Sequence, residues 1–150
     1  MDNTPSRLRN FSMINCAAPK FQYLSYKDEI DTAINKVLSG DSYILGEEVS
    51  SLEKEFSEYI GTKYSVGVAN GTDAIEIALR SLGITLGDEV ITVSHTANAT
   101  VSAIECSGAK PVLVDIDPEF FTMDITALEK AINSKTRAVI LVHLYGQSGD

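Results

Sequence analysis

The stretch Tyr64-Ser-Val-Gly-Val-Ala-Asn-Gly-Thr-Asp-Ala-Ile-Glu-Ile-Ala-Leu79 decides the fold of this chain. Its first part is rich in valine, which favours a pleated, buried surface, and predicts a strand over residues 64–69. Its second part begins a stripe of apolar residues spaced three and four positions apart, namely Ile75, Ala78, Leu79 and Leu82. This spacing predicts an amphipathic helix over residues 72–83.

The junction between this strand and helix, Asn70-Gly71-Thr72, is the first candidate for a binding site. The first turn of a helix carries unpaired N–H groups and the positive end of the helix dipole, which together bind phosphate and other anions. Gly71 lets a ligand approach the backbone closely because it has no Cβ, and Thr72 adds a hydroxyl. A second interpretation stays open, in which Asn70 or Thr72 only caps the helix.

Downstream, strands and helices continue to alternate. Predicted strands cover residues 89–93, 111–115 and 137–142, and predicted helices cover residues 97–107 and 125–133, the second of them capped by Asp124. Short apolar strands that alternate with helices form βαβ units around a largely parallel sheet covered on both faces. The predicted fold class is therefore α/β, with three αβα layers and a mostly parallel sheet.

Upstream, the sequence is less regular. Residues 1–25 are mostly polar and predict an irregular N-terminal arm, with a disordered tail as an equal alternative. Residues 26–39 and 47–60 predict helices. The loop between these helices, Asp41-Ser-Tyr-Ile-Leu-Gly46, is more apolar than a connecting loop usually is. It therefore either packs against the protein or contacts a ligand.

Composition narrows the class of protein. The chain has 150 residues and a formal net charge of −9, which argues against nucleic acid as a partner because phosphate backbones need a basic face. Its two cysteines, Cys16 and Cys106, form no disulfide framework and favour a reducing cytoplasm. The first residues lack the apolar core of a signal peptide, and no apolar run approaches the length of a membrane span.

Three stretches that follow predicted strands are expected to meet at one edge of the sheet. They are residues 70–73, 94–97 and 143–147. Ligands of open α/β sheets bind beyond the carboxyl ends of the strands. This topology predicts a small-molecule site at that edge.

Several common sites are excluded by their missing motifs. The segment Gly67-Val-Ala-Asn-Gly71 is not a dinucleotide fingerprint, and no P-loop motif occurs. The histidines and cysteines have no metal-ligand spacing, so no metal site is predicted. Ser94 lies beside His95, but no nucleophile-elbow motif surrounds it.

Five motifs in order resemble one protein family. They are Gly71-Thr-Asp-Ala-Ile-Glu-Ile-Ala-Leu79, Gly87-Asp-Glu-Val-Ile91, Ser94-His-Thr-Ala-Asn-Ala-Thr100, Gly108-Ala-Lys-Pro-Val112 with Asp115-Ile-Asp-Pro118, and Val142-His-Leu-Tyr-Gly-Gln147. Each is weak alone, but the ordered set is specific. Residues 26–150 thus resemble the DegT/DnrJ/EryC1/StrS family of sugar aminotransferases, which depend on pyridoxal 5'-phosphate (PLP). The resemblance implies the large domain of aspartate-aminotransferase-type (fold type I) enzymes.

The resemblance also implies roles for particular residues. The cofactor phosphate would be held by Gly71, Thr72 and the backbone of Asp73, whose carboxylate would point away from it. Ala97 stands where many members carry an aromatic residue that stacks on the pyridine ring. Either His95 stacks on the ring instead, or another group covers that face. The remaining candidates are expected to line the cofactor or sugar pocket: Tyr43, Leu45, Gly46, His143, Tyr145 and Gln147.

Length is the main departure from the family, whose members are more than twice as long. The Schiff-base lysine of the family lies in a later segment, so it is expected beyond residue 150, and none of the lysines present is assigned to that role. The chain is therefore expected to comprise an arm over residues 1–25 and the N-terminal part of the PLP-binding large domain over residues 26–150. By resemblance, a C-terminal remainder is expected to be missing from this sequence, and the 150-residue chain is expected to be inactive alone.

By resemblance, the intact enzyme would be a cytoplasmic homodimer. It would transfer an amino group from an amino acid, with glutamate as the expected donor, to a keto group of a nucleotide-linked sugar. Three alternatives stay open. The chain could be a non-catalytic fragment or oligomerisation module, or part of a PLP-dependent sugar dehydratase of the same family. It could also be an unrelated α/β phosphate binder, which the order of the five motifs disfavours.

Overall fold

The computed structural model describes residues 16–149 of the chain. It divides into two compact units, Met1–Ser65 and Val66–Asp150, which are described separately. Within the described residues, no helix is both long enough and apolar enough to cross a membrane.

The first unit contains three helices, α1 (Pro19–Ser25), α2 (Lys27–Leu38) and α3 (Glu47–Ile60). The helices α2 and α3 confirm the sequence prediction almost to the residue. Acidic side chains lie in the first turn of both, where the helix dipole favours negative charge. The helix α3 ends at Gly61, whose φ of 78° is the left-handed conformation that glycine adopts without strain.

The prediction of an irregular arm was wrong at its C-terminal end. Residues 19–25 form α1, which begins with Pro19 in the first turn. Proline suits that position because its fixed φ matches the helix and its missing N–H would have been unpaired there. Residues 1–15 of the predicted arm lie outside the described residues.

The first unit buries very little. None of the residues of α1 or α2 is buried, and Ser57 is the buried residue of α3. In the apolar stripe of α2, Ile34 and Leu38 lie exposed, and Ile30 and Val37 are only half-buried. In this unit, therefore, amphipathic helices form without a core of their own among the described residues.

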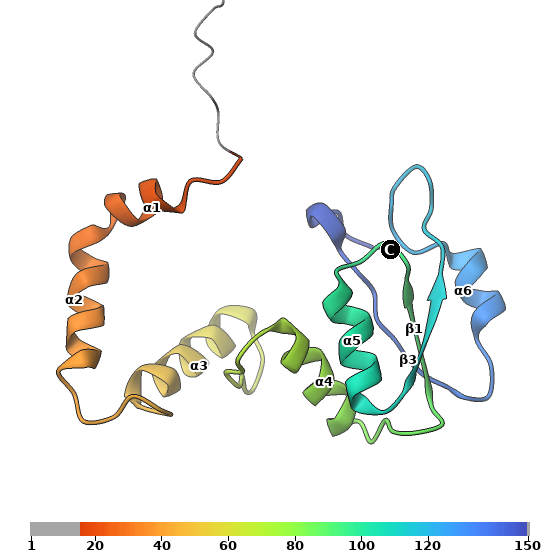
Figure 1. Ribbon diagram of the computed structural model, residues 1–150, viewed down its shortest axis with the longest axis horizontal. Coiled ribbons are helices and arrows are strands. Elements are labelled where there is room, and N and C mark those ends of the chain that lie inside the picture. The colour runs from red at the N-terminus through yellow and green to blue at the C-terminus, as the bar shows by residue number, and fades with distance from the viewer. Residues whose placement is uncertain (1–15, 150) are drawn as a thin grey trace, which may run out of the picture. The chain divides into compact units, whose positions relative to one another are not determined.

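The second unit is a three-stranded parallel sheet with helices on both faces (Figure 1). Its elements in chain order are α4 (Gly71–Ser81), β1 (Glu89–Val93), α5 (Asn98–Ser107), β2 (Lys110–Val114), α6 (Ile125–Ala131), β3 (Thr136–Val139) and the 3-10 turn η1 (Leu144–Gly146). The strand order is β2-β1-β3, so β1 is the central strand and all of its residues are buried.

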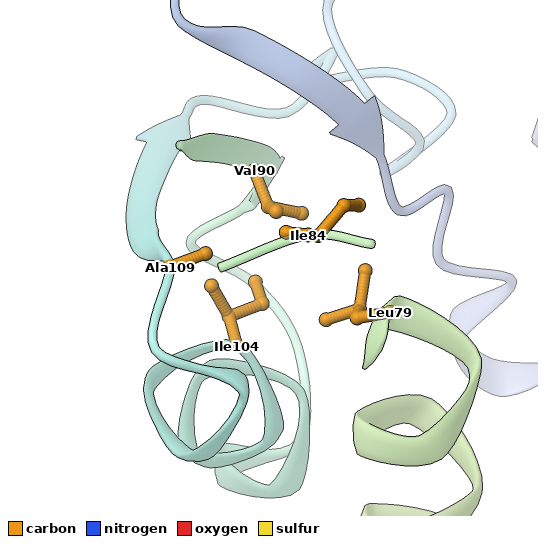
Figure 2. Close-up of a cluster of buried hydrophobic side chains, with 5 residues drawn as sticks. All are labelled: Leu79, Ile84, Val90, Ile104 and Ala109. Atoms are coloured by element: carbon orange, nitrogen blue, oxygen red, sulfur yellow. The ribbon is translucent and has the colours of Figure 1, made fainter. Parts of the chain in front are cut away.

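Two apolar clusters hold the layers together. On one face, α4 and α5 pack on the sheet through the cluster drawn in Figure 2, which comprises Leu79, Ile84, Val90, Ile104 and Ala109. On the other face, α6 packs through the cluster of Ile91, Val93, Val114 and Met123. Because successive residues of β1 enter different clusters, this strand joins the two halves of the core. The predicted three-layer αβα class is confirmed.

The amino-terminal end of β1 is fixed by a polar network. The carboxylate of Glu89 accepts a hydrogen bond from Asn133 Nδ2 at 2.8 Å. It also forms an ion pair with Lys110 Nζ at 3.3 Å. The Asn133 amide, followed by Lys110, holds the pKa of Glu89 below its ordinary value. The network links the strand to the start of β2 and to the loop before β3.

The strand predicted over residues 64–69 is wrong, because these residues form irregular backbone. Val66 and Val68 are 77% and 40% exposed, so their β-forming side chains have no surface to pack on. A strand needs a hydrogen-bonded neighbour, and none of the three described strands pairs with this segment. The predicted strand over residues 137–142 is also shorter, because β3 ends at Val139, although Ile140 N still donates to Ile91 O at 2.8 Å.

Candidate functional site

The first candidate stretch lies at the start of α4. Asn70 is the N-cap, since its Oδ1 accepts a hydrogen bond from Asp73 N at 2.9 Å, and its Nδ2 donates to the Asp73 carboxylate at 3.2 Å. Capping is thus one role of this junction, but it uses only the amide of Asp73. In the described part of the chain, the N–H groups of Gly71 and Thr72 have no protein acceptor.

The backbone at Gly71 is open on the side where a side chain would stand. A Cβ built on Gly71 would meet nothing within 4 Å, and Thr72 is half-buried. Gly71 has no positive φ, so its value here is access to the backbone rather than conformational freedom. Two amides, a hydroxyl and the positive end of a helix of 11 residues therefore meet at one accessible point.

The second stretch connects β1 to α5. Ser94 N donates to Val114 O at 3.0 Å and so extends the strand pairing by one residue. The hydroxyls of Thr96 and Thr100 lie 2.8 Å apart, which ties the loop to the first turns of α5. Ala97 is the N-cap residue of α5 and offers no side-chain cap, and His95 lies half-buried between these anchors.

The third stretch forms η1 after β3. Gly149 N donates to His143 Nδ1 at 2.9 Å, and Gln147 N donates to Leu144 O at 3.1 Å. Tyr145, with φ of 57°, directs its ring toward His95, and the two ring centroids lie 6.0 Å apart in an edge-on arrangement. The structure therefore brings the second and third stretches together, as the topology predicted.

The start of α4 faces the same edge of the sheet. Arg80 Nη2, in the last turn of α4, donates to the carbonyl of Cys106 in the last turn of α5. The two helices have 11 and 10 residues, so their N-terminal ends both point toward the carboxyl ends of the strands. Among the described residues, no hydrogen bond or ring contact joins residues 70–73 directly to His95 or His143.

The remaining candidates lie in the first unit. Tyr43 donates its hydroxyl to Leu38 O at 2.9 Å, Leu45 has a φ of 51°, and Gly46 is the N-cap residue of α3. The loop borders a cavity of about 310 Å³, together with the facing ends of α2 and α3. The Lys36–Glu48 ion pair, at 2.6 Å, lies at the wall of this cavity and raises the pKa of Lys36.

Phe120 and Phe121 were not among the predicted site residues. These residues follow β2 and line a second cavity, of about 360 Å³, together with Tyr145 and Gln147 of the third stretch. The available signal was a pair of adjacent aromatic residues in an otherwise polar loop. In the described part of the chain, no group of three or more histidine, cysteine, aspartate or glutamate side chains is arranged to hold a metal ion.

Comparison with known families identifies the chain. The model of the DegT/DnrJ/EryC1/StrS aminotransferase family matches residues 25–150. The chain belongs to this family. It is 47% identical over 127 residues to the dTDP-3-amino-3,6-dideoxy-alpha-D-galactopyranose transaminase of Aneurinibacillus thermoaerophilus. This match covers 85% of the chain and 35% of the relative. It is also 46% identical over 138 residues to the UDP-2-acetamido-2-deoxy-3-oxo-D-glucuronate aminotransferase of Pseudomonas aeruginosa. That match covers 92% of the chain and 38% of the relative.

Solved structures of the family share this fold. DesV of S. venezuelae, crystallised in complex with a ketimine intermediate, matches with a TM-score of 0.86 and 44% identity over 89% of the chain and 36% of DesV. The PLP form of Spr1654 of Streptococcus pneumoniae matches with a TM-score of 0.78 and 38% identity over 80% of the chain and 31% of that protein. The chain therefore has the fold of PLP-dependent fold type I enzymes and spans about a third of these relatives' length.

Proposed function

We propose that this chain forms the cofactor-phosphate-binding part of a PLP-dependent aminotransferase that acts on a nucleotide-linked sugar. The observation that carries the proposal is the start of α4, where the N–H groups of Gly71 and Thr72 have no acceptor among the described residues and a Cβ built on Gly71 would meet nothing within 4 Å. A dianionic phosphate suits two amides, a hydroxyl and a helix dipole. The PLP form of Spr1654 and the family membership of this chain support PLP as the source of that phosphate.

In this proposal, different residues of the site bind the phosphate and cover the cofactor ring. Gly71, Thr72 and the backbone of Asp73 bind the phosphate, while Asn70 keeps the Asp73 carboxylate engaged at 3.2 Å and so limits its repulsion of the anion. His95, held edge-on to Tyr145, covers the cofactor ring in place of the small Ala97. When bound, PLP supplies the electron sink for amino transfer, and the protein supplies binding and orientation.

The substrate is proposed from the named relatives, which act on dTDP- and UDP-linked sugars. We propose a keto sugar linked to a nucleoside diphosphate as acceptor and glutamate as donor. Tyr43, Leu45 and Gly46 of the first unit are proposed to contact the substrate. Within the second unit, the same role is proposed for His143, Tyr145 and Gln147. A homodimer and a cytoplasmic location belong to the same proposal.

The phosphate site can be tested on the 150-residue chain itself. Pyridoxine 5'-phosphate is the suitable probe because it has the phosphate but lacks the aldehyde that would react with surface lysines. We expect Thr72→Val to weaken its binding about tenfold or more, since a hydrogen bond to a charged group contributes about 1.5–3 kcal/mol. Binding can be followed by the ³¹P resonance of the probe.

Thr126→Val is the matched control. Thr126 occupies the first turn of α6 and is exposed, so the same substitution is made at another helix start. Equal affinity of the Thr72 variant and the control, or equal binding of pyridoxine without phosphate, would refute the phosphate site.

The activity needs a second experiment. Sequencing the gene past Asp150 will show whether the reading frame continues into a lysine-bearing segment. The encoded protein is then incubated with glutamate and a dTDP- or UDP-linked keto sugar, and 2-oxoglutarate is measured. Formation of 2-oxoglutarate together with an amino sugar supports the aminotransferase. Loss of water from the sugar without 2-oxoglutarate would support the dehydratase instead.

A further inference from the structure

Two loops at the carboxyl end of the sheet enclose a cavity that has no role in binding the cofactor phosphate. One loop follows β2 and the other is η1, which follows β3, and Figure 1 shows both at the end to which the strands point. The cavity has a volume of about 360 Å³, within the usual range of roughly 300–1,000 Å³ for ligand pockets. We call it the aromatic notch, and its lining residues are Glu119, Phe120, Phe121, Leu144, Tyr145, Gly146 and Gln147.

The loop after β2 is a firmly hydrogen-bonded platform. Asp117 Oδ1 accepts hydrogen bonds from the N–H groups of Glu119 and Phe120, both at 2.8 Å. Asp117 N donates to Thr122 O at 2.8 Å, and Phe121 N donates to Asp117 O at 2.9 Å. These bonds fix the positions from which the two phenylalanine rings project.

The opposite wall is held in a similar way. Gly146 N donates to His143 O at 3.2 Å, and Gln147 N donates to Leu144 O at 3.1 Å, so Tyr145 lies at the tip of a closed turn. The ring of Tyr145 also meets His95 edge-on. Both walls of the aromatic notch are therefore shaped before any ligand arrives.

The backbone at the aromatic notch is strained where the rings are presented. Phe121 and Tyr145 have φ of 58° and 57°, a conformation that side chains other than glycine rarely adopt. These two residues are 54% and 85% exposed, so burial in the core does not offset the strain. Strain of this kind at exposed aromatic residues is typical of a binding site.

The chemistry of the lining selects one part of a nucleotide. No lysine or arginine lines the aromatic notch and Glu119 is acidic, which disfavours phosphate. Aromatic faces stack on planar bases. The side-chain amide of Gln147, whose only hydrogen bond within the described residues is a long one of 3.5 Å to Ser148 O, offers a donor and an acceptor side by side. The imide edge of uracil or thymine offers the complementary acceptor and donor.

We propose that the aromatic notch binds the pyrimidine base of the nucleotide-sugar substrate, with Tyr145 stacking on the base and Gln147 pairing with its imide edge. This proposal rests on the proposed function, because it assumes a nucleotide-linked substrate. It narrows that substrate to uridine and thymidine diphosphate sugars. It also gives Phe120 and Phe121 a role in specificity.

Uridine is the sharpest probe because it carries the base and ribose without phosphate. Its binding to the 150-residue chain is measured by saturation-transfer NMR, with pyrophosphate, UDP and GDP as comparison probes. We expect Tyr145→Ala to weaken uridine binding about tenfold or more, as removal of one base–aromatic stack does. Tyr145→Phe keeps the ring and should bind within about twofold of the original chain. Gln147→Leu should reduce the preference for UDP over GDP.

Tyr59→Ala is the matched control, because Tyr59 is as exposed as Tyr145 and lies on α3 in the first unit. The proposal is overturned if uridine shows no saturable binding, or if Tyr145→Ala and Tyr59→Ala bind it equally. It is also overturned if GDP binds as well as UDP. Pyridoxine 5'-phosphate tests the cofactor site separately. The chain can therefore bind pyridoxine 5'-phosphate without binding uridine, or bind uridine without pyridoxine 5'-phosphate, and the two proposals are tested independently.

Discussion

Thr92 gives the sharpest test of how the core positions the candidate site. It lies in the central strand β1 with no exposed surface, and its hydroxyl donates a hydrogen bond of 3.1 Å to Ile140 O. Ile140 follows the end of β3 and precedes His143 by three residues. The hydroxyl therefore anchors the segment that carries the third stretch of the site.

The substitution Thr92→Val isolates this hydrogen bond. Valine has the shape of threonine and an equal or better preference for strands, so packing in β1 should be preserved. The loss comes from leaving the carbonyl of the half-buried Ile140 without its donor, which costs about 1–2 kcal/mol, below the upper end for a fully buried group. We expect the free energy of unfolding to fall by about 1–2 kcal/mol. For a chain of this size, each kcal/mol lost lowers the melting temperature by roughly 2–4 °C.

Urea denaturation of the original chain and the variant measures this loss. Amide hydrogen exchange gives a second readout, because residues 140–147 should exchange faster while α5 stays protected. Thr126→Val, at an exposed site on α6, is the control and should change stability by less than about 0.5 kcal/mol. If Thr92→Val proved as stable as the original chain, with unchanged exchange beyond β3, the hydroxyl would not be the anchor.

Three further predictions concern stability. Ile104→Ala should lower the free energy of unfolding by about 2–5 kcal/mol in urea denaturation, because Ile104 is fully buried, whereas Ile77→Ala, at an exposed site, should cost far less. Asn70→Ala should cost about 1 kcal/mol through loss of the α4 cap, whereas Asn70→Ser, which keeps a capping oxygen and adds no negative charge beside Asp73, should cost less. The lowered pKa of Glu89 means that its ionised form stabilises the fold above its ordinary pKa of 4.5, and this contribution is lost as the pH falls through the lowered value. Urea midpoints should therefore fall on acidification below pH 4.5, and less steeply in Glu89→Gln; equal slopes would contradict this assignment.

Much of the fold could be predicted because its signals are local. The strand at Glu89–Val93 and the helix at Glu47–Ile60 occur where apolar spacing and flanking glycines indicated them. The predicted strand over residues 64–69 failed for a physical reason. Its valines favour a strand, but pairing depends on a neighbour that local sequence does not specify.

The candidate site was predictable where topology decided it. The meeting of His95 and Tyr145 follows from parallel strands whose carboxyl ends share one edge. The aromatic notch was not predictable in the same way, because it depends on positive φ angles at Phe121 and Tyr145. Sequence rules assign such angles to glycine, and these two residues adopt them because the surrounding hydrogen bonds hold the backbone there.

The complete burial of β1 restricts how relatives of this chain can diverge. Val90 and Ile91 enter different clusters, so inserting or deleting one residue between Glu89 and Val93 would exchange the side chains of the two clusters. The same shift would turn His95 to the other side of the sheet. Changes in length should therefore accumulate in the exposed turn at residues 85–87 and be absent from the strand.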